Sequence, residues 1–273
     1  MASTEKLETL HLFLDEAGDT TFYGKGGVSA VGQQEGVSLS FAIGMTKFRG
    51  EIRAIREEIR ALQATVVADR YLKVIPSVAK KAARSGFYFH ATDDPPEVRE
   101  RFFRFVSELD CTCEVVVARK LPSMFARKHN NREAEFYADV LSHLLKKKLG
   151  LGNRVVLNIA ERGESTRNNN LQLALEKAVE RFAKKRRADE VSSRVVFNVQ
   201  THYTEPLLNV ADYMCWSVQR VFERGETRYY DFLGDKIPLV LDLYDSANYE
   251  GSRNYYRGGR RLTAENKLSP PSS

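Results

Sequence analysis

Cysteine and long apolar runs are scarce in this sequence. Only three of its 273 residues are cysteines and no two form a CxxC pair, which argues against a disulfide framework or a cysteine-rich zinc site. Cys111 and Cys113 fall in an expected strand and Cys215 in an expected helix, so we expect core thiols. No segment approaches the ~18 consecutive apolar residues of a membrane span, and residues 1–10 lack a secretory signal pattern. We therefore predict a cytoplasmic protein that does not act at a membrane.

The composition is that of an ordinary globular chain with a basic balance. Hydrophobic residues make up 42% and charged residues 29%, and the length suffices for a sizeable core. The formal net charge is +6, with an isoelectric point near 9.1. This balance is compatible with nucleic-acid binding, although basic clusters at helix ends are equally typical of solvated surface.

Periodicity predicts three opening strands and then strands that alternate with helices. We expect strands over residues 9–15, 37–45, 112–119, 154–160 and 194–199, and helices over 51–68, 96–109, 133–149, 169–187 and 205–223. Alternation favours parallel strands covered by helices, whereas the opening strands can be antiparallel. The predicted fold is α/β, with a mixed central sheet and helices on both faces. This is the layout of the ribonuclease H-like architecture, and other α/β folds also satisfy it.

The sequence predicts one main domain over residues 1–250. Residues 70–110 read as a helical insertion, with a helix after Pro76 and a strand-like aromatic run, Phe87-Tyr88-Phe89-His90. Residues 251–273 have few apolar side chains, so we expect a flexible C-terminal tail.

Two adjacent carboxylates end the first apolar strand. Asp15 and Glu16 follow Leu12-Phe13-Leu14 and precede a turn at Gly18. A carboxylate at the end of a buried strand is costly to desolvate unless a cation or hydrogen-bond donors compensate it. The pair therefore indicates a metal or phosphate site, while an ordinary solvated turn is the alternative. Glu16 points to the opposite strand face unless the chain bends at Gly18, and Asp19 is expected to cap the turn.

A second apolar strand also delivers a carboxylate at its C-terminal end. Residues 154–160 are followed by Glu161 and by a polar loop that contains Arg162 and Arg167, side chains suited to binding a phosphate of the substrate. Sites in open α/β sheets lie outside the carboxyl ends of strands, where Asp15 and Glu161 both fall. The alternative is a solvated loop.

A third acidic position lies on the last long helix. Asp212 flanks an apolar stripe of that helix, from which its carboxylate can face the sheet edge. A structural hydrogen bond to a neighbouring loop is the alternative. Together Asp15, Glu161 and Asp212 would form an all-oxygen site for Mg²⁺ or Mn²⁺.

One histidine is a further catalytic candidate. His90 closes the aromatic run, where it would act as a general base or orient a phosphate. A structural histidine after a strand is the more common case.

Two short motifs resemble those of a widespread prokaryotic family of mostly uncharacterised proteins, a domain of unknown function. Asp15-Glu16-Ala17-Gly18-Asp19 is similar to its N-terminal Asp-Glu motif, and Asn209-Val210-Ala211-Asp212 to its C-terminal Gln-x-x-Asp motif, with Asn in place of Gln. The likeness spans about residues 10–235. It implies a ribonuclease H-like fold, metal-dependent nuclease activity that uses Asp15, Glu16 and Asp212, a substrate contact at Asn209, and for some members a part in phage defence.

Three functions remain open from the sequence. The first is a nuclease that hydrolyses DNA or RNA with Mg²⁺ or Mn²⁺. A phosphatase with Asp15 as nucleophile is less favoured, because the haloacid dehalogenase-like pattern would have a second Asp where Ala17 stands. The third is a non-catalytic module that binds nucleic acid or protein on the same fold.

Overall fold

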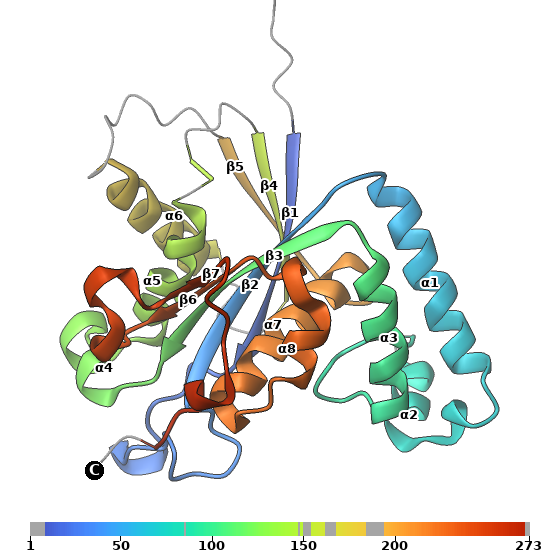
Figure 1. Cartoon of the computed structure of the whole chain (residues 1–273), viewed down its shortest axis with the longest axis horizontal. Coiled ribbons are helices and arrows are strands. Elements are labelled where there is room, and N and C mark those ends of the chain that lie inside the picture. Colours follow the sequence, from blue (N-terminus) through green and yellow to red (C-terminus); the bar gives the residue numbers. More distant parts are fainter. Residues whose placement is uncertain are drawn as a thin grey trace, which may run out of the picture.

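A seven-stranded mixed sheet forms the centre of the molecule (Figure 1). The structure is a computed structural model that describes residues 9–84, 86–146, 148–149, 154–161, 168–183 and 194–270. The strands are β1 Thr9–Gly18, β2 Ser40–Phe48, β3 Cys111–Arg119, β4 Arg154–Ala160, β5 Arg194–Gln200, β6 Leu239–Leu243 and β7 Tyr255–Arg257. Their order in the sheet is β5-β4-β1-β2-β3-β6-β7.

The strand directions follow the expected pattern. β2 is antiparallel to both β1 and β3, whereas β1, β4 and β5 run parallel to one another. β6 is parallel to β3, and β7 closes the sheet as an antiparallel edge strand. The carboxyl ends of β1, β4 and β5 therefore lie at one edge of the sheet, as predicted for the strands that carry Asp15 and Glu161.

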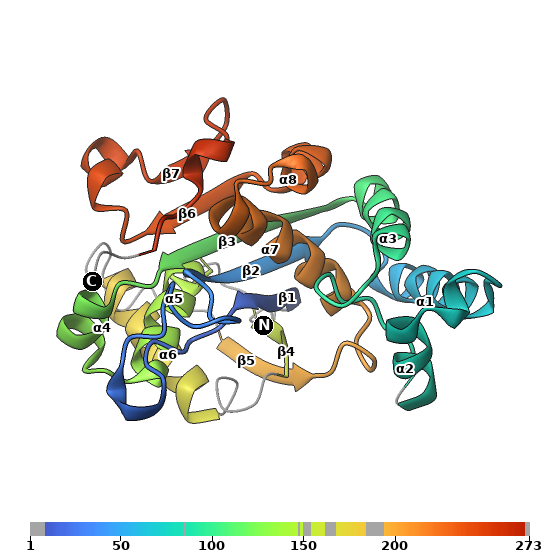
Figure 2. The ribbon, with the colours of Figure 1, turned by 90° about the horizontal axis from the view of Figure 1, so that it is seen from below.

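Helices cover both faces of the sheet (Figure 2). The helices are α1 Ile52–Ala68, α2 Pro76–Arg84, α3 Pro96–Glu108, α4 Pro122–His129, α5 Glu133–Leu145, α6 Asn168–Ala183, α7 Leu207–Arg224 and α8 Arg228–Leu233. α1, α2, α3, α7 and α8 pack on one face, and α4, α5 and α6 on the other. The mixed α/β architecture with helices on both faces is thus confirmed.

Side chains of β1 alternate between the two faces of the sheet and so contribute to the hydrophobic core on each face. Phe13 and Ala17 point into the core under α7, while Leu12 and Leu14 point into the core under α5 and α6. Because both faces are buried, the strand reads as a continuous apolar run. α7 approaches the sheet closely at Gly44 of β2, where a Cβ atom would lie 2.9 Å from Cβ of Cys215.

The insertion between β2 and β3 is helical as predicted, but its aromatic run is not a strand. Residues 87–90 belong to no sheet. The backbone N–H of Phe89 instead donates to Oδ1 of Asn209, at 2.9 Å, and that of Ala91 donates to Oδ2 of Asp212, at 2.6 Å. Side chains of α7 thus accept the backbone hydrogen bonds that a neighbouring strand would accept if this segment were in a sheet.

The C-terminal segment is not the unstructured tail that we expected. Residues 255–257 form β7, and Leu262 is buried. The N–H of Leu268 donates to the carbonyl of Phe222 in α7, at 2.7 Å. A few spaced apolar side chains anchor this segment although its average apolar content is low, and residues 271–273 lie outside the described residues.

The three cysteines are buried free thiols, which confirms their predicted place in the core. In the part of the chain that the structure describes, no helix has the length and apolar character needed to cross a membrane.

Candidate active site

A cavity of about 770 Å³ opens at the carboxyl end of β1. It lies between the strand ends, the loop that precedes β2, and α7. Carboxylates dominate its charged lining: Asp15, Glu16, Asp19, Glu161, Asp212 and Glu223. The three residues predicted to bind a metal therefore line one cavity, although they come from β1, the end of β4, and α7.

β1 stays regular to its last residue, so its two carboxylates lie on opposite faces. Asp15 is on the α7 face and Glu16 on the other, yet both line the cavity and both are more than 90% buried. Gly18 has φ +86°, and a Cβ atom there would lie 2.3 Å from the carbonyl oxygen of Ser40. Only glycine fits at this strand end, because a side chain would meet both strained backbone and a steric clash.

Asp19 has the structural role that the sequence predicted. Its carboxylate accepts the backbone N–H of Thr21 at 2.8 Å and that of Ser38 at 2.7 Å, and Nζ of the buried Lys120 lies 2.9 Å away. Burial raises the pKa of Asp19, but Lys120 and Ser38 outweigh it and hold the pKa below its usual value. Asp19 therefore fixes the turn beside the cavity.

His202 forms an ion pair with Asp15. Its Nε2 lies 2.6 Å from Oδ2 of Asp15, while Oδ1 of Asp15 accepts the backbone N–H of Glu16 at 2.8 Å. Burial lowers the pKa of His202, but the charge of Asp15, its hydrogen bond and the charge of Asp212 together outweigh burial, so the pKa is raised. Sequence reasoning missed His202, although it follows β5 by two residues and the rule that found Asp15 and Glu161 also applies to it.

Asp212 is a buried carboxylate that lies near a second one, Asp15. Oδ2 accepts the N–H of Ala91, yet burial and the charge of Asp15 raise the pKa of Asp212 to about 6, against the opposing effect of His90 and His202. A bound cation would reduce the repulsion between these two buried carboxylates.

His90 lines the same cavity and is positively charged at neutral pH. Burial lowers its pKa, but the charge of Asp212 and a contact with Asp93, whose Oδ2 lies 3.2 Å from Nδ1, raise it to about 9. The rings of His90 and His202 are perpendicular, with centroids 5.8 Å apart. The positive charge of His90 disfavours its predicted general-base role, because a protonated imidazole cannot accept a proton.

The side chain of Asn209 links three segments around the site by hydrogen bonds. It is fully buried, and besides the bond from Phe89 its Oδ1 accepts Nε2 of Gln63 at 3.1 Å. Its Nδ2 donates to the carbonyl of His202 at 2.9 Å. We expected Asn209 to contact substrate, whereas this amide is engaged within the protein and does not line the cavity, which gives it a positioning role.

Glu161 lies at the exposed rim. Its N–H donates to the carbonyl of Gln200 at 2.8 Å, which extends the pairing of β4 and β5 beyond Ala160. Arg162 and Arg167, predicted to bind substrate, lie outside the described residues.

The donor chemistry of the cavity suits a hard divalent cation, because carboxylate oxygens come from three elements. Among the described residues, however, no group of three or more His, Cys, Asp and Glu side chains is placed so that it could hold a metal ion. Oδ1 of Asp15 accepts the Glu16 N–H, and Oδ2 contacts His202. A cation could therefore bind Oδ2 only if His202 moved.

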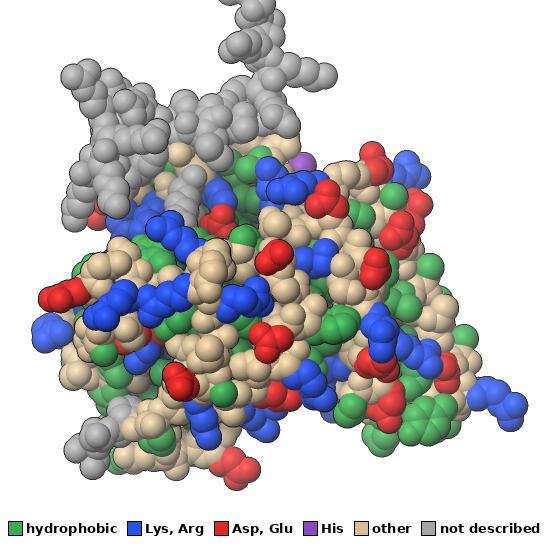
Figure 3. Space-filling model, viewed as in Figure 1, with side chains coloured by type: hydrophobic (Ala, Val, Ile, Leu, Met, Phe, Trp, Pro, Cys, Tyr) green, Lys and Arg blue, Asp and Glu red, His purple; other side chains and the backbone are tan. Residues whose placement is uncertain are grey.

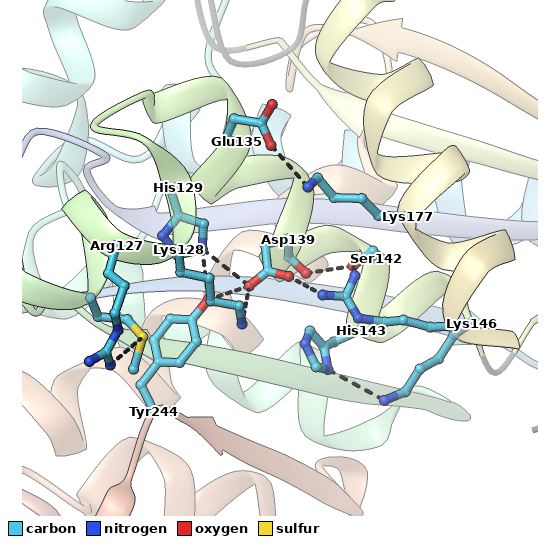
Figure 4. A network of polar contacts seen from close by, with 12 residues as sticks. Arg127, Lys128, His129, Glu135, Asp139, Ser142, His143, Lys146, Lys177 and Tyr244 are labelled. Carbon is cyan, nitrogen blue, oxygen red and sulfur yellow. Dashed lines mark hydrogen bonds and ion pairs between the residues drawn. The ribbon is translucent and has the colours of Figure 1, made fainter. Parts of the chain in front are cut away.

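A second buried carboxylate–histidine cluster lies on the other side of the sheet (Figure 4). Asp139 of α5 contacts Nζ of Lys128 at 2.8 Å and Nε2 of His129 at 3.2 Å, and it also accepts hydrogen bonds from Arg181 and Tyr244. Burial raises the pKa of Asp139, but these donors outweigh it and hold the pKa far below its usual value. This carboxylate is fully compensated within the protein.

No model of a known protein family matches this chain, and searches of curated proteins and of solved structures gave no match. The resemblance to the family with Asp-Glu and Gln-x-x-Asp motifs therefore rests on those short motifs and stays a prediction. The site is defined by its own geometry: the buried carboxylates Asp15, Glu16 and Asp212, two histidines and a rim carboxylate around one cavity.

Proposed function

We propose that this protein is a divalent-metal-dependent nuclease that hydrolyses phosphodiester bonds of DNA or RNA. The observation that carries the proposal is the meeting of Asp15 and Asp212 in one cavity, where burial and mutual repulsion raise the pKa of Asp212 to about 6. We also infer a ribonuclease H-like fold, supported by the opening antiparallel strands and the helix-connected parallel strands that follow.

Asp15, Asp212 and the rim carboxylate Glu161 would hold the cation. When bound, Mg²⁺ or Mn²⁺ supplies an activated water and stabilises the leaving oxygen. His90 and His202, whose pKa values are raised, would donate hydrogen bonds or a proton to phosphate oxygens. Glu16 adds negative charge to the same cavity, and Asn209 keeps His202 and the 87–91 segment in place.

The phosphatase alternative has less support. Oδ1 of Asp15 accepts a backbone N–H and Oδ2 contacts His202. A carboxylate with both oxygens engaged is poorly prepared for nucleophilic attack on a phosphoester.

The test compares wild type with Asp15→Asn and Asp212→Asn in Mn²⁺-dependent cleavage of single- and double-stranded DNA and RNA. We expect each variant to lose about 10²–10³-fold in rate, as is typical when one group that stabilises transition-state charge is removed. Asp110→Asn, at an exposed carboxylate before β3, is the matched control and should cleave like wild type.

Equal rates in all four proteins would show that cleavage does not come from this site. Calorimetric titration with Mn²⁺ separates the remaining alternative. Absence of metal uptake together with salt-dependent oligonucleotide binding would instead support a non-catalytic binding module.

A further inference from the structure

A second cavity adjoins the acidic one. It measures about 470 Å³ and is lined by Pro76, Ser77, Lys80, Lys81, Arg84, Tyr88 and Asp93. Tyr88 lines both cavities, so the two are neighbours across this single ring. The basic cavity is thus built mainly by α2, part of the helical insertion.

The net positive charge of this cavity comes from two exposed side chains. Lys81 is buried and paired with Asp94, whose Oδ1 lies 2.8 Å from its Nζ, and Asp93 is paired with His90. By contrast, Lys80 and Arg84 are exposed, and neither has a carboxylate within 4.0 Å among the described residues. Their charges are therefore available to an anionic ligand.

A further exposed cation lies at the opposite end of the acidic cavity. Arg224, in the last turn of α7, lines that cavity and likewise has no carboxylate within 4.0 Å in the described part of the chain. It follows Asp212 by 12 residues in the sequence (224 − 212), which is roughly 18 Å along a helix that rises ~1.5 Å per residue. In Figure 2, α2 lies nearer to the N-terminal end of α7 than to its C-terminal end, and Arg224 is the last residue of α7.

This charge arrangement differs from that of the visible surface. Figure 3 shows Lys and Arg side chains interspersed with Asp and Glu over one face of the molecule, without a continuous positive area. Around the cavity, by contrast, Lys80 and Arg84 lie on one side of the buried carboxylates, and Arg224, next to Glu223, lies on the other. The acidic centre repels a polyanion, so cations on both sides are what would draw a phosphate chain across it.

We propose that Lys80 and Arg84 bind phosphates on one side of the scissile bond and that Arg224 binds a phosphate on the other side. The substrate is then a polynucleotide strand that crosses the site and is cut internally, rather than a mononucleotide or a chain end. This inference rests on the proposed nuclease function.

The test measures binding without metal, so that it does not depend on cleavage. Fluorescence anisotropy follows a labelled single strand of roughly 20 nucleotides in EDTA over a series of salt concentrations, for which each phosphate contact contributes a slope of about 0.7 in log K against log [salt]. The variants are Lys80→Ser with Arg84→Ser, and Arg224→Ser alone. Arg127→Ser with Arg257→Ser, exposed on α4 and β7, is the matched control.

We expect the double variant to lower the salt slope by about 1.4 and Arg224→Ser by about 0.7, each with weaker binding, while the control pair leaves both unchanged. Hydrolysis of bis(p-nitrophenyl) phosphate with Mn²⁺ should be unchanged in the control pair Arg127→Ser with Arg257→Ser, because neither residue lines either cavity.

The inference would be overturned if both site variants bound the oligonucleotide with the same affinity and salt slope as wild type. It would also be overturned if wild type did not bind the oligonucleotide. If Asp15→Asn cleaves as well as wild type, the nuclease proposal fails instead, since the binding series is read without turnover. Cleavage products released only from chain ends would also contradict the crossing strand.

Discussion

Two buried carboxylates, Asp139 and Asp212, lie on opposite faces of the same sheet and differ in their compensation. Asp139 contacts a lysine, an arginine, a histidine and a tyrosine hydroxyl, and its pKa is held far below the usual value. Asp212 accepts one backbone N–H and lies near the charges of His90 and His202, but also near a second anion, Asp15, and its pKa is raised to about 6. Burial raises the pKa of both carboxylates, and the partners of Asp139 outweigh it whereas those of Asp212 do not.

The comparison separates a structural carboxylate from one available to a ligand. A buried charge that is fully paired stabilises the packing around it, and removing one partner is costly. A buried charge without such pairing lowers stability in the empty protein and is retained where it serves binding or catalysis. Both clusters contain a histidine next to an aspartate, so this pairing alone does not tell a structural carboxylate from one available to a ligand.

The largest expected effect on stability is in the Asp139 cluster. Asp139→Asn would leave Lys128 and Arg181 without their shared anion, and we expect the free energy of unfolding to fall by about 3–5 kcal/mol. Urea denaturation followed by circular dichroism measures this change. A loss below about 1 kcal/mol would show that the cluster is not the stabilising centre described here.

His143, a buried histidine near Asp139 and Arg181, predicts acid sensitivity (Figure 4). Burial, and next the charge of Arg181, lower the pKa of His143 from 6.5 to about 3. Because the unfolded chain takes up this proton below about pH 6.5 and the folded chain does not, stability should fall with decreasing pH by up to about 1.4 kcal/mol per unit.

His143→Gln removes this proton uptake, so the variant should lose less stability than wild type between about pH 6.5 and about pH 4. Urea denaturation at several pH values checks the difference. Parallel pH profiles of the two proteins would exclude His143 as the cause.

The smallest expected effect on stability has the opposite sign. Asp212→Asn keeps an acceptor for the Ala91 N–H and removes a buried charge, so we expect a gain of about 1 kcal/mol at about pH 8. Because the folded pKa is raised, the penalty on wild type arises as pH increases through about 6, and the gain should vanish near about pH 4. Destabilisation at about pH 8 of the size expected for Asp139→Asn would remove the contrast between the clusters.

Periodicity predicted the long elements of the fold well. The helix expected over 51–68 is α1, Ile52–Ala68, and the strand expected over 154–160 is β4, Arg154–Ala160. The short elements α4, β6 and β7 were not predicted, because runs of three to eight residues carry too little periodic signal. The aromatic run 87–90 failed for a different reason: its backbone partners are side chains more than 100 residues away.

The strand-end rule placed Asp15 and Glu161 at one edge of the sheet, and the helix face placed Asp212 near them. The sequence could not reveal which side chains and backbone groups contact these carboxylates. The contact of His202 with Asp15 joins residues 187 positions apart, and the internal use of Asn209 depends on three segments that meet only in the folded protein.

The hydrogen bonds from Phe89 and Ala91 to α7 have a consequence for the modularity of the chain. The segment between β2 and β3 resembles a dispensable appendage in the linear sequence, yet it supplies His90 and the donor that orients Asp212. Excising it would remove His90 and the Ala91 donor from the acidic centre, and would also expose the core on the α7 face, to which Ile59 and Phe102 contribute. Insertion and sheet must therefore be inherited, or engineered, as one unit.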